Sequence, residues 1–199
     1  MKKDQRNVII LDELISELKG FLKEYFYEKT IKPISWAWKG RNCMSESNQL
    51  VTFQLGEELY GINIMDVKEI VRVQNVRSIP NAPMYVEGIF NLRSEIIPII
   101  NLHRRFHLKK IAVSEEDELL SGFIILDIDG MKLGVIIDKV SRVVTIEQEE
   151  VQPPPQMVAG IGAEYIQGVV RQEKGYLIIL NIRDLFNPKE LQKIAELRR

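Results

Sequence analysis

The spacing of apolar side chains changes near residue 49. Between residues 11 and 26, apolar residues recur every three or four positions and charged residues take the opposite face, which predicts one amphipathic helix. From residue 49 onward, short runs rich in Val, Ile, Leu, Phe and Tyr are broken by Gly, Pro and Asn, a pattern typical of small β domains. Near the end, Asn187 suits an N-cap and Pro188 a first helical position, so a second helix is predicted over residues 188–199.

Ten strands are expected from the apolar runs, at residues 49–55, 59–64, 70–73, 86–90, 96–100, 122–127, 131–137, 142–145, 166–170 and 176–180. Two turn sequences support hairpins between them. Gly56-Glu57-Glu58 separates the first two strands, and Asp129-Gly130 separates the sixth from the seventh. Many short strands with regular turns indicate a barrel or a sandwich, so the predicted fold class is all-β with terminal helices.

The apolar pattern of the first half of the chain recurs in the second half. The block Gly61 to Ile70 recurs 73 residues later as Gly134 to Val143. Two further blocks, Tyr85 to Ile89 and Ile97 to Leu102, recur 80 residues later as Tyr165 to Val169 and Leu177 to Ile182. The change of offset falls at the stretch 152–155, where prolines exclude a central strand. The sequence therefore predicts a structural duplication with one insertion.

The two copies define the expected domain organisation. The first repeat covers about residues 49–106 and the second about residues 122–186, each with five strands, and an exchange of strands between them is left open. This size predicts two SH3-like barrels packed together within a folded unit of residues 44–187. Residues 1–43 are expected to be a helical extension and linker. They are interpreted as an accessory helix, as a stretch ahead of an internal start at Met44, or as a docking helix.

Repeated glycines and tyrosines have structural roles in this interpretation. Four glycines are expected at bulges or tight bends where a side chain would clash, namely Gly61, Gly88, Gly134 and Gly168. Tyr85 and Tyr165 occupy equivalent positions and are expected to pack their rings and hydrogen-bond their hydroxyls inside the fold.

Composition narrows the class of protein. Of the 199 residues, 45% are hydrophobic and 28% are charged, which is usual for a globular protein. The formal charge of -1 provides no overall field to attract nucleic acid or anionic lipid, so neither is an expected partner. Cys43 is the single cysteine and cannot form an internal disulfide. No apolar stretch approaches the roughly 20 residues of a membrane helix, so a cytoplasmic protein is expected.

Side chains for catalysis or metal binding are sparse. His103 and His107 lie four residues apart, but no third ligand has matching spacing, and the second repeat has Arg183 and Asn187 at these positions. No catalytic, cofactor-binding or metal site is therefore predicted, and binding is the expected activity. The hairpin at residues 91–95 differs in sequence from its counterpart in the second repeat, which indicates a specialised contact there.

Over about residues 49–187 the chain resembles the CheW-like adaptors of bacterial chemotaxis. The motifs that carry the resemblance are Leu59-Tyr60-Gly61-Ile62-x-Ile64, Val67-x-Glu69-Ile70, Tyr85-Val86-x-Gly88-Ile89-x-Asn91-Leu92-Arg93, Ile97-Pro98-Ile99-Ile100-Asn101-Leu102, Arg105-Phe106 and Pro153-Pro154-Pro155. The resemblance implies two five-stranded barrels with a receptor-binding groove between them. It also implies a non-enzymatic adaptor that couples chemoreceptors (methyl-accepting chemotaxis proteins) to a CheA-type histidine kinase, at receptor arrays under the inner membrane.

The same resemblance implies a set of receptor-facing residues: Ile64, Val67, Glu69, Gly88, Asn91, Leu92 and Arg93. Arg93 is expected to contribute most, because a guanidinium can present a fixed fork of hydrogen-bond donors. Two positions depart from the family pattern, Ser94 where Gly is usual and Asn101 where Asp is usual. The alternatives are a coupling module of a related kinase pathway outside chemotaxis and a duplicated barrel that binds nucleic acid. The sequence leaves the individual partners and the oligomeric state open.

Overall fold

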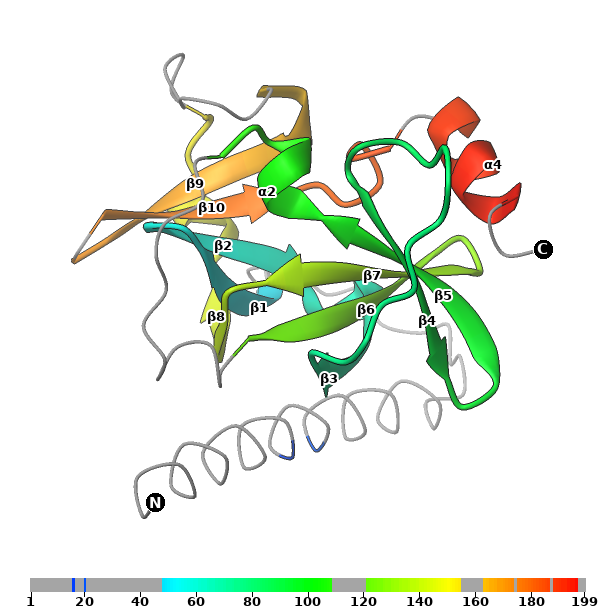
Figure 1. The fold of residues 1–199 in the computed structure, drawn as a ribbon. Coiled ribbons are helices and arrows are strands. Elements are labelled where there is room, and N and C mark those ends of the chain that lie inside the picture. Colours follow the sequence, from blue (N-terminus) through cyan, green and yellow to red (C-terminus); the bar gives the residue numbers. More distant parts are fainter. Residues whose placement is uncertain are drawn as a thin grey trace, which may run out of the picture.

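Ten strands form the body of the molecule, and all ten predicted strands are present, with ends that differ by up to three residues (Figure 1). The structure is a computed structural model and describes residues 48–108, 121–154, 163–173, 175–186 and 188–196, together with Ser16 and Gly20. The strands are β1 (Asn48–Leu55), β2 (Glu58–Asn63), β3 (Val67–Arg72), β4 (Val86–Leu92), β5 (Glu95–Asn101), β6 (Gly122–Ile128), β7 (Met131–Ile137), β8 (Lys139–Ile146), β9 (Ile166–Gln172) and β10 (Gly175–Leu180). Both predicted hairpins are also present, with Asp129-Gly130 as one turn and only Gly56 and Glu57 as the other, because Glu58 already belongs to β2.

Helical segments are short within the described residues. They are α2 (Leu102–Arg105), α4 (Pro188–Glu196) and the 3-10 turns η1 (Ile64–Asp66), η2 (Gln148–Glu150) and η3 (Ala163–Tyr165). The predicted C-terminal helix is present as α4, while its N-cap and last three residues lie outside the described residues. The helix predicted over residues 11–26 also lies outside them, apart from Ser16 and Gly20. No helix in the described part of the chain has the length and apolarity needed to cross a membrane.

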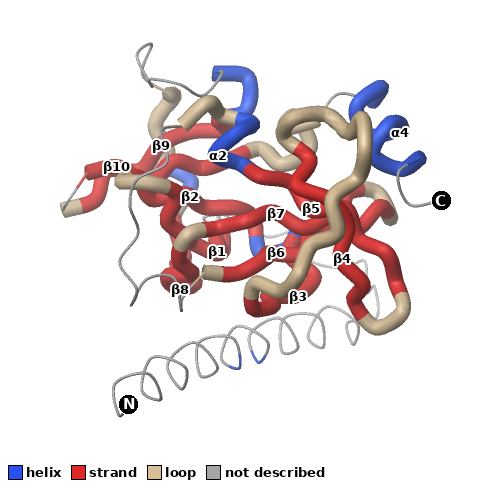
Figure 2. Tube along the Cα trace, viewed as in Figure 1, coloured by secondary structure: helices blue, strands red, loops and turns tan. Residues whose placement is uncertain are grey.

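Each sheet combines strands from both repeats. One sheet, called barrel A below, has the strand order β8-β1-β2-β10-β9, and the other, barrel B, has the order β3-β6-β7-β5-β4. The β1–β2 hairpin of the first repeat therefore lies between strands of the second repeat, and the β6–β7 hairpin of the second lies between strands of the first. Each hairpin is joined to its host strand by a parallel pair, β2 with β10 and β7 with β5. Figure 2 shows the two sheets packed side by side.

A short segment beyond one edge strand closes each sheet into a barrel. After β3, Arg77 pairs with Ile89 of β4, and the N–H of each donates to the carbonyl of the other at 2.9 Å. After β8, Gln152 and Val169 of β9 exchange the same two bonds at 2.9 and 2.8 Å. Because β3 and β4 are the two edges of one sheet, and β8 and β9 those of the other, these bridges bring the edges of each sheet together.

Gly88 and Gly168 lie beside these closing bridges, each next to a register shift. A Cβ atom at Gly88 would lie 2.2 Å from the carbonyl oxygen of Arg77, and one at Gly168 would lie 2.4 Å from Cγ1 of Val151. No side chain fits at those separations, so glycine is what lets the closing segment approach the strand.

Gly61 and Gly134 have a different role, and the expectation of a bulge is wrong at these two positions. Both lie in regular parallel pairs. A Cβ atom would be 3.3 Å from Cδ1 of Leu177 at Gly61 and 2.6 Å from Cδ1 of Ile99 at Gly134. The missing side chains therefore make room for aliphatic packing within each barrel.

The main hydrophobic core lies between the barrels. It draws buried side chains from both sheets, such as Phe53 and Tyr60 of barrel A and Ile124 and Val135 of barrel B. Two smaller clusters each belong to one sheet: Leu50, Ile146, Val170, Leu177 and Ile179 in barrel A, and Phe90, Ile97, Ile99, Phe123 and Ile125 in barrel B. Because successive side chains of a strand point to opposite faces, one face of each sheet fills its own barrel and the other packs on the partner barrel. The two barrels are therefore joined by their largest apolar surface.

Candidate protein-interaction site

The β4–β5 hairpin ends in a two-residue turn with an uncommon backbone conformation. Leu92 pairs with Glu95, so Arg93 and Ser94 form the turn, and their φ angles are 51° and 71°. Two successive residues in the left-handed region give the turn type that matches the twist of hairpin strands. The Ser94 N–H donates to Oδ1 of Asn91 at 2.9 Å, which supports the turn. Arg93 consequently stands at the end of the hairpin. Figure 1 shows the β4–β5 hairpin and the β9–β10 hairpin at opposite sides of the molecule.

Arg93 is exposed but anchored at one point. Its Nη2 donates to Oε2 of Glu69 at 3.0 Å, and the side chains of Arg93 and Glu69 are 76% and 15% exposed. Glu69 lies on β3 and Arg93 on the β4–β5 turn, so the ion pair spans the line along which barrel B closes. A half-buried carboxylate thus orients a guanidinium whose remaining donors face solvent.

The seven residues implied as receptor-facing fall into two groups. Ile64 and Val67 are each 1% exposed and belong to the core between the barrels, and Gly88 is buried beside the closing bridge. The other four gather at the end of barrel B: Asn91 and Arg93 are exposed, and Glu69 and Leu92 are half-buried. A partner can therefore contact the four residues at the end of barrel B directly. The three buried residues can affect binding only through the packing of the barrels.

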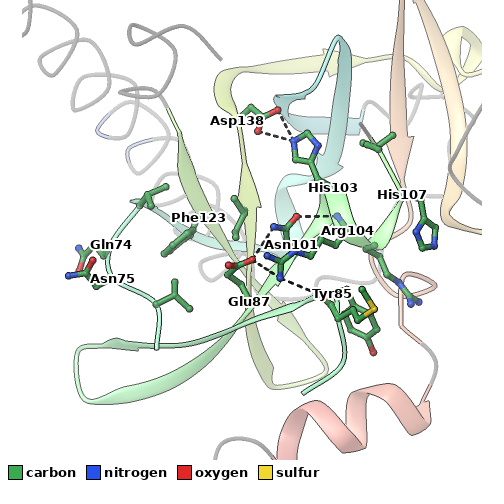
Figure 3. A pocket seen from close by; sticks show the side chains of 16 residues that line it. Gln74, Asn75, Tyr85, Glu87, Asn101, His103, Arg104, His107, Phe123 and Asp138 are labelled. Atoms are coloured by element: carbon green, nitrogen blue, oxygen red, sulfur yellow. Dashed lines mark hydrogen bonds and ion pairs between the residues drawn. The ribbon is translucent and has the colours of Figure 1, made fainter. Parts of the chain in front are cut away.

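A groove of about 850 Å³ opens beside the segment that follows β3. Its polar wall is a network around Glu87, whose Oε2 accepts from Nδ2 of Asn101 at 3.1 Å and pairs with Nη1 of Arg104 at 3.2 Å (Figure 3). Asn101 also caps α2, because its Oδ1 accepts from the N–H of Arg104. Phe123 and Ile136 form part of the apolar wall. Residue spacing along the chain does not predict this groove, because its walls come from segments far apart in the sequence.

The two histidines do not act together. The Nε2 atom of His103 lies 2.9 and 2.8 Å from the two carboxylate oxygens of Asp138, whereas His107 lies at the rim of the groove (Figure 3). Within the described ranges, no group of three His, Cys, Asp or Glu side chains could hold a metal ion. The His103–Asp138 pair is therefore described as a structural contact.

Arg105 occupies an aromatic box that sequence reasoning missed. Its guanidinium carbon is 4.7 Å from the ring centre of Tyr85, 5.4 Å from that of Tyr165 and 5.5 Å from that of Phe186. The same group pairs with Glu190 of α4 at 3.0 Å. Both tyrosine hydroxyls are hydrogen-bonded, as predicted, that of Tyr85 to Glu190 and that of Tyr165 to Arg105. Burial, reinforced by the Glu190 charge, raises the pKa of Tyr85, and Arg105 opposes that rise.

Two closed barrels share one large core, and an exposed arginine is held at a hairpin tip by an ion pair. The chain is therefore a double β-barrel protein with an exposed polar hairpin, a class that the fold defines without fixing its function. The CheW-like domain family matches residues 49–190. The chain belongs to the CheW-like family of chemotaxis adaptors.

Relatives with recorded functions support this assignment. The chain is 66% identical over 152 residues to the chemotaxis protein CheW of Treponema pallidum, which covers 76% of this chain and 89% of that protein. It is 31% identical over 143 residues to the chemotaxis protein CheW of Klebsiella aerogenes, covering 72% and 84% of the two chains. The crystal structure of the scaffolding protein TtCheW from Thermoanaerobacter tengcongensis superimposes with a TM-score of 0.65 at 35% identity, covering 77% of this chain and 96% of that one.

Proposed function

We propose that this chain is a non-enzymatic adaptor that couples the cytoplasmic tips of chemoreceptors to the regulatory domain of a CheA-type histidine kinase. The support is its membership of the CheW-like family and the double barrel with its exposed hairpin tip. The coupling unit would be residues 44–187, located in the cytoplasm at receptor arrays.

The observation that carries the proposal is the tethered arginine at the end of barrel B. Arg93 uses one guanidinium nitrogen to bind Glu69 and is 76% exposed, so further N–H donors are available to a partner. Carboxylate and carbonyl oxygens on a receptor helix are suitable acceptors for this fork. Asn91 and Leu92 flank Arg93 and would complete the receptor-facing surface.

Coupling follows from the shared core. A receptor bound at one surface and a kinase bound at another would be held in a set geometry, because the barrels pack through a common apolar interface. A ligand can shift a conformational equilibrium in its partner only by binding one state more tightly than the other. The adaptor would therefore act by favouring the kinase conformation that fits the receptor-bound assembly.

The test is the substitution Arg93→Ala in the full chain. We expect the affinity for a chemoreceptor tip fragment to fall about tenfold or more, in the range of an interface arginine that contributes substantially to binding. The thermal melt should change little, because the Arg93 side chain is 76% exposed and water can take its place at the Glu69 carboxylate. Arg171→Ala is the matched control, since Arg171 is exposed on the second-repeat hairpin. Equal effects of both substitutions on receptor binding would contradict the proposal.

A further inference from the structure

Two polar contacts related by the internal repeat join the barrels. Asn101 and Asn181 lie at equivalent positions and each accepts a hydrogen bond from the backbone just after it. Two residues beyond each asparagine stands a nitrogen-bearing side chain, His103 in the first repeat and Arg183 in the second. Each of these side chains reaches toward the hairpin that the other barrel has acquired by strand exchange.

The His103 contact is shielded. His103 follows β5 of barrel B and lies 2.8 Å from Oδ2 of Asp138, and the same oxygen accepts from the N–H of Gly56 at 2.7 Å. Gly56 forms the tip of the β1–β2 hairpin in barrel A. The side chains of His103 and Asp138 are only 14% and 19% exposed.

The equivalent contact of the second repeat, made by Arg183, is exposed to solvent. Arg183 follows β10 of barrel A, and its Nη1 lies 2.6 Å from Oδ1 of Asp129, at the tip of the β6–β7 hairpin in barrel B. These two side chains are 58% and 74% exposed. Asp66 of η1 interacts electrostatically with both Arg183 and Asp129. Its pKa is raised mainly by loss of solvent, Arg183 opposes that rise and Asp129 adds to it.

The Asp129 tip is connected to the receptor-facing residues by strand pairing. Asp129 follows β6 directly, and Glu69 of β3 pairs with Ile125 of β6. Lys68 and Asp127 add an ion pair at 3.9 Å across the same two strands. Glu69 in turn binds Arg93. A shift of the β6–β7 tip would therefore be transmitted to the anchor of the hairpin arginine.

We propose that Arg183 is a positioning residue, which holds the β6–β7 tip and η1 against barrel A so that Glu69 presents Arg93 in its binding geometry. The relevance to receptor binding rests on the proposed function, whereas the contact between the barrels does not. Arg183 lies far from Arg93 in the sequence, so its effect on Arg93 passes through Asp129 and the β6–β3 pair, and through Asp66 directly before β3.

The first test measures the contact itself by amide hydrogen exchange on the full chain. Arg183→Gln should speed exchange about two- to fivefold in residues 64–69 and 127–131, the size expected for an exposed charged contact. Arg171→Gln is the control, because it also removes one positive charge from barrel A, on strand β9. It should leave the exchange rates of residues 64–69 and 127–131 unchanged. Equal protection of these segments in the Arg183→Gln and parent chains would overturn the proposal.

The second test measures binding to a chemoreceptor tip fragment. Arg183→Gln should weaken binding about two- to fivefold, and Arg183→Lys should recover part of the loss because it restores the charge. Exchanging the two charges, Arg183→Asp with Asp129→Arg, should also recover part of it. Faster exchange with unchanged affinity would overturn the positioning role. If Arg93→Ala leaves receptor binding intact, the proposed function fails, and the exchange result still decides the contact between the barrels.

Discussion

At the scale of single residues, the two departures from the family pattern have different physical consequences. Ser94 has a φ of 71°, a region in which a side chain crowds the following carbonyl, so the glycine usual at this position is the less strained residue. Asn101 does more than an aspartate could. It accepts the α2 cap bond through Oδ1 and donates to Glu87 through Nδ2, whereas a carboxylate would face Glu87 with a like charge.

Ser94→Gly should stabilise the protein. Relief of the left-handed backbone is worth about 1 kcal/mol and is partly offset by the greater freedom of glycine in the unfolded chain, so a net gain of about 0.5 kcal/mol is expected in urea unfolding. Ser141→Gly, placed in the extended strand β8, should instead be destabilising. A loss of stability for Ser94→Gly would show that the turn is not strained by its serine.

Asp66 should make stability depend on pH. Its pKa is raised in the folded state, chiefly by loss of solvent, so the folded protein binds this proton more tightly than the unfolded chain does. The resulting stability is fully present below the ordinary pKa of aspartate and is lost as the pH rises through the folded value. Asp66→Asn, which mimics the protonated state, should therefore raise stability at neutral pH by no more than about 0.5 kcal/mol, since solvent screens the group. The gain should vanish near pH 3 in denaturant titrations; a gain independent of pH would point to another cause.

At the scale of elements, α4 is attached to the barrels by one charged group and one apolar face. Ile194 is fully buried in the core between the barrels, and Leu191 packs beside it. Glu190 binds Arg105, which stacks in the aromatic box. The sequence predicts the helix and its apolar face, but the partner of Glu190 lies 85 residues away and has no local signature.

Arg105→Met should loosen this attachment. Removing the guanidinium takes away the positive charge that faces the Glu190 carboxylate in a largely buried site, which should cost about 2 to 3 kcal/mol in urea unfolding. Adding Glu190→Gln should recover part of the loss because the negative charge is then removed as well. Arg104→Met, at a side chain that is 51% exposed, should cost under about 1 kcal/mol. Equal costs at positions 104 and 105 would argue against the attachment described here.

At the scale of the whole molecule, strand exchange makes the two repeats one folding unit. Barrel A needs β1 and β2 from the first repeat, and barrel B needs β6 and β7 from the second. The largest core forms only when both sheets are present. Neither repeat therefore contains a complete barrel of its own.

Fragments cut between the repeats should show this directly. Residues 44–110 and 111–199, expressed separately, should each lack a cooperative unfolding transition, because each lacks two or three strands of either barrel. Mixing the two fragments should restore a single cooperative unfolding transition, which can be monitored by circular dichroism. Cooperative unfolding of either fragment alone would contradict the interdependence of the repeats.

The sequence by itself determined the ten strands, the hairpin turns and the duplication, because strand periodicity and turn chemistry are local properties of the chain. Only the tertiary structure decided which strands share a barrel. The two repeats are similar in sequence, so a strand could pair equally well with a strand of its own repeat or with the equivalent strand of the other. It also decided that Ile64 and Val67 are buried, and it paired Arg183 with Asp129 and Arg105 with Glu190. Such contacts join residues that meet only after the barrels have packed, so no spacing along the chain encodes them.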